Sequence, residues 1–150
     1  PLERSSGRVL APRPLVVVPI LRAGLGMVQP FLDLFPDVSV GYIGLERDHA
    51  TALARSYYSK LPALDGRHIF VIDPMLATGG SAVRALDGVK AAGGRDIALL
   101  TIVSSPEGVA AVGRHHADVS IFTVALDREL NAAKYILPGL GDFGDRLYGT

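Results

Sequence analysis

The chain has 150 residues, 49% of them hydrophobic, and 15 basic residues balance 15 acidic ones to a formal net charge of zero. This length fits one domain with its own core, and the charge balance argues against a nucleic-acid-binding protein, which needs a basic face. No apolar run approaches the ~20 residues that span a bilayer and no signal peptide is visible, so we expect no membrane partner. The chain has no cysteine, which excludes disulfides and zinc–thiolate sites and is compatible with the cytoplasmic location that we expect.

The first part of the chain predicts one strand and one helix. Residues 1–14 are polar and contain three prolines, which is typical of the end of a preceding segment. We therefore expect a missing upstream segment, and a single domain over residues 1–150. Leu15–Val18 is a continuous apolar run that predicts a strand stopped by Pro19. Residues 20–26 then form a loop into a helical stretch over residues 27–34.

A second strand is predicted over residues 38–45, and a long polar excursion follows it. The excursion over residues 49–62 contains two tyrosines and closes on a Lys-Leu-Pro sequence. Long loops in compact domains are usually functional or disordered, so we expect a mobile hairpin here. Arg47 lies at its mouth, where it is as well placed to pair with Glu46 or Asp48 as to bind a ligand.

The stretch around Asp73 carries the clearest functional signal. Ile69–Ile72 is rich in β-branched residues and predicts a buried strand that ends at this carboxylate. Residues 77–81 (ATGGS) are small or carry hydroxyl groups, and Ser81 suits the N-cap of a helix over residues 82–92. Backbone N–H groups at a helix start bind anions well, so this loop predicts a phosphate site.

The remaining chain continues the alternation of strands and helices. Strands are predicted over residues 97–103 and 119–125, and a helix over residues 106–115 begins at a favourable proline. The tail over residues 131–150 is rich in glycine and aspartate and shows no period. Apolar strands alternating with helices predict an α/β fold, a mostly parallel, doubly wound sheet of about five strands. Ligands bind such sheets beyond the carboxyl ends of the strands.

Other polar residues give weaker signals. Arg22 follows an apolar strand in a loop poor in charge, where it could clamp phosphate oxygens. Asp142 and Asp145 lie among glycines, so turn formation explains them as well as catalysis does. The four histidines show no metal-ligand spacing, and we assign no metal site to the chain. Tyr135 is interpreted as a packing residue that leads into the tail.

Four segments together resemble the uracil phosphoribosyltransferase family of the type I phosphoribosyltransferases. Residues 72–81 (IDPMLATGGS) resemble the motif that binds phosphoribosyl pyrophosphate (PRPP), in the Asp-Pro variant found in this family. Residues 19–27 (PILRAGLGM), 105–108 (SPEG) and 135–142 (YILPGLGD) agree with the family in the same order. The resemblance covers nearly the whole chain and implies the family's fold, with the mobile hairpin and an irregular C-terminal hood.

The resemblance implies the reaction of uracil with PRPP to give UMP and pyrophosphate in pyrimidine salvage. It implies that Arg22 and Arg47 bind pyrophosphate, that Asp73 holds the ribose hydroxyls and that Asp142 faces PRPP and its Mg²⁺. The implied uracil contacts, largely through backbone groups, are Ile136, Gly141, Asp142 and Phe143. The implied PRPP-binding loop comprises Asp73, Pro74, Met75, Leu76, Ala77, Thr78, Gly79, Gly80 and Ser81. Mg²⁺ is usually held by substrate phosphates with few carboxylates, so no dedicated metal cage is expected.

The chain departs from the family pattern at two residues. Glu46 stands where an aromatic residue is expected, and Phe143 stands where a small residue is usual. Phe143 could narrow the base pocket or point away and pack. The family also implies a homo-oligomer, a dimer or higher, with the missing upstream segment taking part. Two alternatives stay open: a catalytically silent relative that acts as a regulatory or fusion domain, and a phosphoribosyltransferase for another base.

Overall fold

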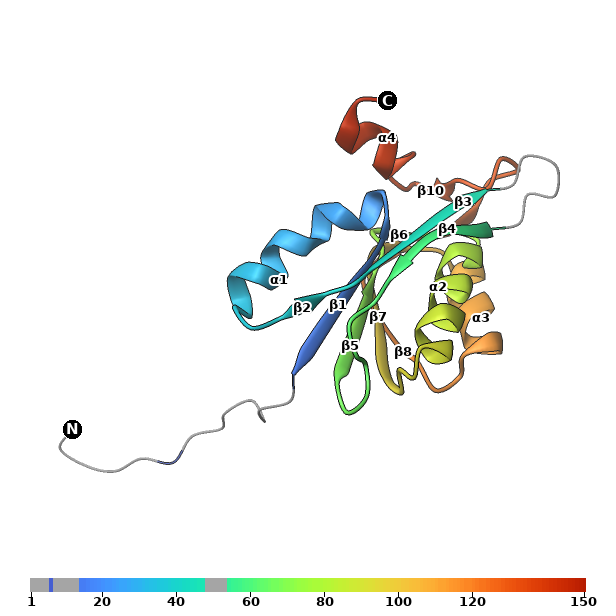
Figure 1. Ribbon diagram of the computed structural model, residues 1–150. Coiled ribbons are helices and arrows are strands. Elements are labelled where there is room, and N and C mark those ends of the chain that lie inside the picture. Colours follow the sequence, from blue (N-terminus) through green and yellow to red (C-terminus); the bar gives the residue numbers. More distant parts are fainter. Residues whose placement is uncertain (1–5, 7–13, 48–53) are drawn as a thin grey trace.

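The computed structural model describes residues 6, 14–47 and 54–150. These residues form an eight-stranded sheet with helices on both faces and a small C-terminal unit above one edge (Figure 1). The strands of the sheet are β1 (Leu15–Leu21), β2 (Ser39–Val40), β3 (Tyr42–Arg47), β4 (Ala54–Lys60), β5 (His68–Ile72), β6 (Met75–Leu76), β7 (Asp96–Ser104) and β8 (Ser120–Leu126). The helices are the 3₁₀ helix η1 (Ala23–Met27), α1 (Val28–Leu34), α2 (Gly80–Ala91), α3 (Pro106–His115) and α4 (Phe143–Tyr148).

The sheet is parallel except at one edge. Its spatial order is β4-β3-β1-β5-β7, with β8 beside β7, and only the β3–β4 pair among the described strands of this sheet is antiparallel. The short β2 pairs with β1, and β6 pairs with the end of β7. The predicted α/β fold with a mostly parallel, doubly wound sheet is therefore confirmed, with three strands more than expected.

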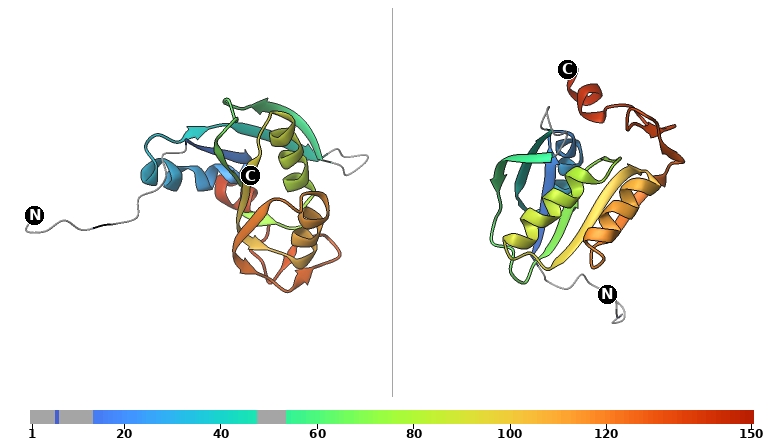
Figure 2. Two further views of the ribbon diagram at one scale, coloured as in Figure 1. Left: turned by 90° about the horizontal axis from the view of Figure 1, so that it is seen from below. Right: turned by 90° about the vertical axis from the view of Figure 1, so that its right-hand side faces the viewer.

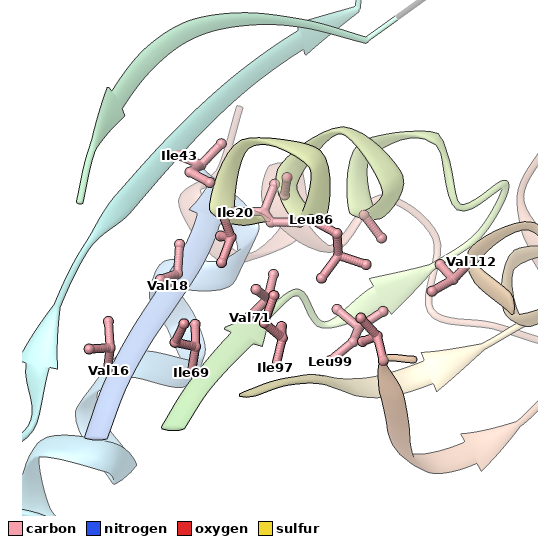
Figure 3. Close-up of a cluster of buried hydrophobic side chains, with 14 of the residues drawn as sticks. Val16, Val18, Ile20, Ile43, Ile69, Val71, Leu86, Ile97, Leu99 and Val112 are labelled. Atoms are coloured by element: carbon pink, nitrogen blue, oxygen red, sulfur yellow. The ribbon is translucent and has the colours of Figure 1, made fainter. Parts of the chain in front are cut away.

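Two apolar layers hold the helices against the sheet. One layer joins β1, β5 and β7 to α2 and α3, and Figure 3 shows its side chains meeting between the sheet and these helices. Leu86 of α2 and Val112 of α3 are fully buried there. The other layer joins Val17 and Ile72 to Val28 of α1 on the opposite face. Burying these side chains is the main favourable term in folding, and it fixes the strand ends that carry the loops.

The prediction that Pro19 stops the first strand is wrong, because β1 continues to Leu21. Proline lacks the N–H group that a ladder hydrogen bond needs. In β1, however, the pairing with β2 ends at Val17 and the pairing with β3 begins at Ile20. Pro19 falls in the interval between these two partners, so its missing donor costs little.

The prediction that Ser81 caps α2 is also wrong. The helix begins at Gly80, and its N-cap is Gly79 with a φ of 80°. Glycine adopts this left-handed conformation without the penalty of a Cβ atom. A Cβ at Gly79 would also lie 2.9 Å from the Cβ of Ala111 on α3, so the position requires glycine for two reasons. Ser81 is instead the second residue of the helix and is exposed.

The polar excursion after β3 is partly described. β4 returns antiparallel to β3, with Tyr42 opposite Lys60 and Arg47 opposite Ala54, so the predicted hairpin is present. Residues 48–53 lie outside the described residues. The mobility of the hairpin stays a prediction.

The C-terminal tail is more regular than predicted. It holds a two-stranded antiparallel sheet of β9 (Glu129–Leu130) and β10 (Ile136–Leu137), followed by α4. The right-hand view in Figure 2 shows this unit as a separate layer beyond the sheet. We call residues 127–150 the hood. No helix in the described part of the chain is long and apolar enough to cross a membrane.

Candidate active site

A cavity of about 290 Å³ lies between the carboxyl end of β5 and the hood. Residues from three separate parts of the chain line it. They are Ala23 after β1; Asp73, Met75 and Ala77 after β5; and Ala133, Lys134, Tyr135, Ile136, Gly141, Asp142, Phe143 and Gly144 from the hood. The cavity therefore brings the loop with the predicted phosphate site together with the segment expected to read uracil.

Asp73 is the acidic group that the sheet delivers to this cavity. Its backbone N–H donates to the Leu100 carbonyl at 3.1 Å, which extends the pairing with β7 by one residue. Burial raises the pKa of the Asp73 carboxyl to about 7, although a hydrogen bond from the backbone of Met75 works in the opposite direction. A carboxyl group with such a pKa exists in both protonation states near neutral pH.

Asp142 reaches the same cavity from the hood. It is the N-cap of α4, and its Oδ1 accepts a hydrogen bond from the Asp145 N–H at 3.0 Å. An N-cap side chain satisfies one of the unpaired donors of a helix start. Asp142 therefore has a structural role in addition to its place in the cavity wall, as turn chemistry suggested.

The start of α2 presents the predicted phosphate loop. Thr78, Gly80 and Ser81 are exposed, while Gly79 is buried against α3. The backbone N–H of Gly80 donates a long hydrogen bond of 3.5 Å to the Thr78 hydroxyl. The first N–H groups of a helix have no partner within the helix and carry its partial positive charge. Gly80 and Ser81 at the helix start are exposed, and Ala77, three residues before Gly80, lines the cavity.

Two members of the predicted PRPP loop point into the protein. Leu76 is only 1% exposed and belongs to the core beneath α2. Pro74 is buried, has no N–H group, and its carbonyl accepts hydrogen bonds from Ile102 and Val103 at 3.0 and 2.9 Å. Both residues fix the shape of the loop, and their contacts with PRPP stay a prediction.

Arg22 lies at the edge of the site and is held by the hood. Its guanidinium group is 3.4 Å from Asp145 Oδ1 and 3.4 Å from the Thr150 hydroxyl, and it lies over the ring of Tyr148 at 5.9 Å. Its side chain is half exposed. Long, exposed contacts of this kind contribute little and exchange easily with a ligand. The side chain of Arg47 lies outside the described residues.

The expected uracil segment combines one buried side chain with accessible backbone. Ile136 of β10 is 4% exposed, and Gly141 is exposed with a φ of 72°. Phe143 lines the cavity, and its ring also packs near Gly26, where a Cβ atom would lie 3.5 Å from Cε1. Phe143 therefore lines the cavity and also lies beside η1, and a narrowing of the base pocket by its ring stays a prediction.

Five residues of the cavity wall were not predicted. They are Ala23, Ala133, Lys134, Tyr135 and Gly144. Small residues such as Ala23 carry no chemical signal in a sequence. Lys134 could have been noticed, because it is the cation nearest the uracil segment in sequence, and it adopts a positive φ of 67° that is uncommon for a residue with a side chain.

A carboxylate at the end of a central parallel strand, a Gly-rich helix start beside it and a hood across the gap are the parts of a phosphoribosyltransferase of type I. A purine phosphoribosyltransferase from Pyrococcus horikoshii shares this fold, with a TM-score of 0.59 at 15% identity over 77% of this chain and 75% of that one. A sequence model described as uracil phosphoribosyltransferase matches residues 1–150. The chain belongs to the uracil phosphoribosyltransferase family, which are pentosyltransferases.

Two longer proteins show this relationship in detail. The uracil phosphoribosyltransferase of Fervidobacterium nodosum is 54% identical over the whole chain, which spans 73% of that protein. The solved structure of the AQ2163 protein from Aquifex aeolicus has a TM-score of 0.86 at 40% identity, covering 91% of this chain and 65% of that one. The resemblance inferred from the four sequence segments is therefore confirmed.

Proposed function

We propose that this chain transfers the 5-phosphoribosyl group of PRPP to uracil, giving UMP and pyrophosphate in pyrimidine salvage. One observation carries this proposal most directly. A single cavity joins Asp73 and Ala77 of the predicted PRPP loop to Ile136 and Gly141 of the predicted base segment. A transfer between two substrates requires that their binding groups meet in one place. We further propose that residues 1–150 act as one domain.

The PRPP side of the site follows from the loop after β5. We propose that the N–H and hydroxyl groups of residues 77–81 bind the 5′-phosphate. The first N–H groups of α2 have no partner within the helix, and the Gly80 N–H makes only a long hydrogen bond to the Thr78 hydroxyl, at 3.5 Å. Asp73 would hold the ribose hydroxyls. Arg22 and Arg47 would bind pyrophosphate, and Arg22 would exchange its contacts with Asp145 and Thr150 for it.

The base side of the site is built from the hood. We propose that uracil is read by Ile136, Gly141, Asp142 and Phe143, mainly through their main-chain groups. The positive φ of Gly141 turns the chain at this point, and uracil carries both donors and acceptors that backbone groups can match. The buried Ile136 side chain anchors this segment. The Phe143 ring in the cavity wall offers an apolar aromatic surface that suits a pyrimidine ring.

Mg²⁺ would enter this site with PRPP. Two carboxylates, Asp73 and Asp142, line the cavity, and no group of three His, Asp or Glu side chains that could hold a metal occurs within residues 14–47 and 54–150. This donor set fits a hard ion that keeps most of its ligands as phosphate oxygens and water. The ion would supply charge neutralisation for the departing pyrophosphate.

The chemistry makes use of these groups in a specific way. As pyrophosphate leaves the anomeric carbon, the ribose develops oxocarbenium character, as in glycoside cleavage. The negative charge grows on the leaving oxygen atoms, where arginine side chains such as Arg22 stabilise it. Closure of the site would exclude water that could otherwise hydrolyse PRPP.

We also propose a homo-oligomer, a dimer or higher. Phe122, Val124 and Leu126 alternate along β8 and are 59%, 84% and 60% exposed. A row of exposed apolar side chains on one sheet face is typical of an interaction surface. The cytoplasmic location stays a prediction.

The function is tested by incubating the full-length protein with PRPP, Mg²⁺ and one base at a time. We expect UMP from uracil and no nucleotide from hypoxanthine or adenine. Turnover of a purine base would contradict the uracil assignment. PRPP binding without turnover of any base would support the alternative of a catalytically silent relative.

A further inference from the structure

The start of α3 contacts both the PRPP loop and the hood from outside the cavity wall. Its residues 105–108 are not among the described residues that line the cavity. They nevertheless form hydrogen bonds to the PRPP loop on one side and to the hood on the other. This arrangement is a direct physical connection between the loop and the hood.

Ser105 forms the connection to the PRPP loop. It is completely buried, and its Oγ donates a hydrogen bond of 2.6 Å to the carbonyl of Ala77. The same oxygen accepts from the Gly108 N–H at 3.0 Å, so it is also the N-cap of α3. The Ser105 N–H donates to the carbonyl of Leu76 at 2.9 Å. Ser105 therefore holds two successive peptide groups of the loop.

Two glycines allow this close approach. A Cβ at Gly108 would lie 2.4 Å from the Ala77 oxygen and 2.6 Å from the Leu76 oxygen. A Cβ at Gly79 would lie 3.0 Å from the Gly108 oxygen. Backbone therefore packs on backbone here, and a small displacement of α3 moves the loop with it.

Glu107 forms the connection to the hood. Its Oε1 accepts a hydrogen bond of 3.0 Å from the Leu130 N–H of β9. This bond is the largest cause that lowers the pKa of the Glu107 carboxyl, so the group is ionised at neutral pH. Leu130 pairs with Ile136 of β10, which belongs to the cavity wall. Glu107 thus acts on the base segment through one strand pair.

We propose that Ser105 and Glu107 are positioning residues that fix the spacing between the PRPP loop and the base-reading hood. This inference rests on the proposed function. Ser105 sets the loop through Ala77, and Glu107 sets the hood through Leu130. Ser105 also has a minor interaction with the Glu107 carboxylate, but the main bonds of the two residues reach different sides, so loss of each should affect one substrate more than the other.

The first test replaces Ser105 in the full-length protein. Ser105→Ala should raise the KM for PRPP about tenfold, since a buried hydrogen bond is lost, and should change the KM for uracil much less. Ser105→Thr keeps the hydroxyl and should restore most of the affinity. Ser104→Ala is the matched control, because Ser104 is equally buried but its hydroxyl bonds Thr101 and Thr123 instead.

The second test replaces Glu107. Glu107→Ala should raise the KM for uracil about tenfold, since a charge-assisted hydrogen bond is lost, with a smaller change for PRPP. Glu107→Gln keeps an acceptor oxygen and should restore part of the loss. Glu129→Ala is the control, because Glu129 lies on the same strand pair but its carboxylate pairs with the exposed Arg128.

The outcomes separate this inference from the proposed function. A wild-type protein that forms no UMP contradicts the proposed function, and the inference falls with it. A wild-type protein that forms UMP, together with Ser105→Ala and Glu107→Ala variants that alter both KM values in parallel or match their controls, contradicts the positioning roles alone. Thermal unfolding of each variant identifies any that fail to fold. If an alanine variant does not fold, the KM values of Ser105→Thr or Glu107→Gln for PRPP and uracil decide the result in its place.

Discussion

Asp73 lies in the wall of the candidate active site, where burial disfavours the charged form of its carboxyl group. Asp73 directly follows β5, and burial raises the pKa of its carboxyl to about 7. Side chains whose pKa is strongly shifted by burial in a cleft are frequent at functional sites.

Replacement of Asp73 by asparagine should lower the rate of UMP formation roughly 100-fold, the scale seen when one preorganised polar group is lost from a transition state. Steady-state kinetics with uracil and PRPP measure this. Asp65→Asn is the control, because Asp65 is an exposed aspartate in the turn before β5 and outside the cavity wall. An unchanged rate in Asp73→Asn would contradict the proposed contact between Asp73 and the ribose hydroxyls.

The same substitution should raise stability above neutral pH. The folded-state pKa of Asp73 is about 7 and lies above the ordinary aspartate pKa of 3.8, so the folded state binds this proton more tightly than the unfolded state. Stability contributed by the proton is therefore lost as the pH rises from about 4 to 7. The gain in Tm of Asp73→Asn over wild type should be larger at pH 8 than at pH 5, and thermal unfolding at both values measures it. An equal gain at both pH values would show that the carboxyl is not perturbed.

At the scale of elements, the loop after β5 could be predicted from the sequence, but the regular structure of the hood could not. The loop could be predicted because an apolar strand, a carboxylate and small residues follow one another in sequence. The regular structure of the hood could not, because β9 and β10 have two residues each and α4 has six. Such short elements show no hydrophobic periodicity. They are held by individual hydrogen bonds, such as the one that the Gly139 N–H donates to the Asp127 carboxylate.

Gly139 tests the hood as an element. Its φ is 54°, and a Cβ atom would lie 2.2 Å from the carbonyl oxygen of Ile136. Gly139→Ala should raise the KM for uracil and destabilise the protein by roughly 1–3 kcal/mol through backbone strain. Gly66→Ala is the matched control, because Gly66 has a φ of 66° and nothing lies within 4 Å of its Cβ position. Equal KM values in the two variants would show that hood geometry does not affect base binding.

At the scale of the whole molecule, local patterns predicted the strands of the sheet, whereas the cavity residues could be predicted only through the family resemblance. Apolar runs identify buried strands locally, so β1, β5, β7 and β8 were found to within three residues. The meeting of residues 73–77 with residues 133–144 depends on how the hood folds back over the sheet, which no local pattern encodes. The choice of Gly79 as the cap of α2 likewise depends on its contact with α3.

The exposed row on β8 gives a prediction for the assembled molecule. Val124→Asp should shift the protein toward the monomer, because a charge in an apolar interface lacks a partner. Size-exclusion chromatography with light scattering measures the mass. Ala92→Asp is the control, because Ala92 is exposed at the end of α2 on the other side of the sheet. An unchanged mass in Val124→Asp would place any subunit contact elsewhere.

The central claim is that one cavity holds the phosphoribosyl group and the base together. An experimental structure of the full-length protein with UMP tests it most directly. We expect the phosphate of UMP at the N–H groups of residues 77–81, the ribose beside Asp73 and the pyrimidine against Ile136 and Phe143. A nucleotide bound outside the cavity between β5 and the hood would contradict the account.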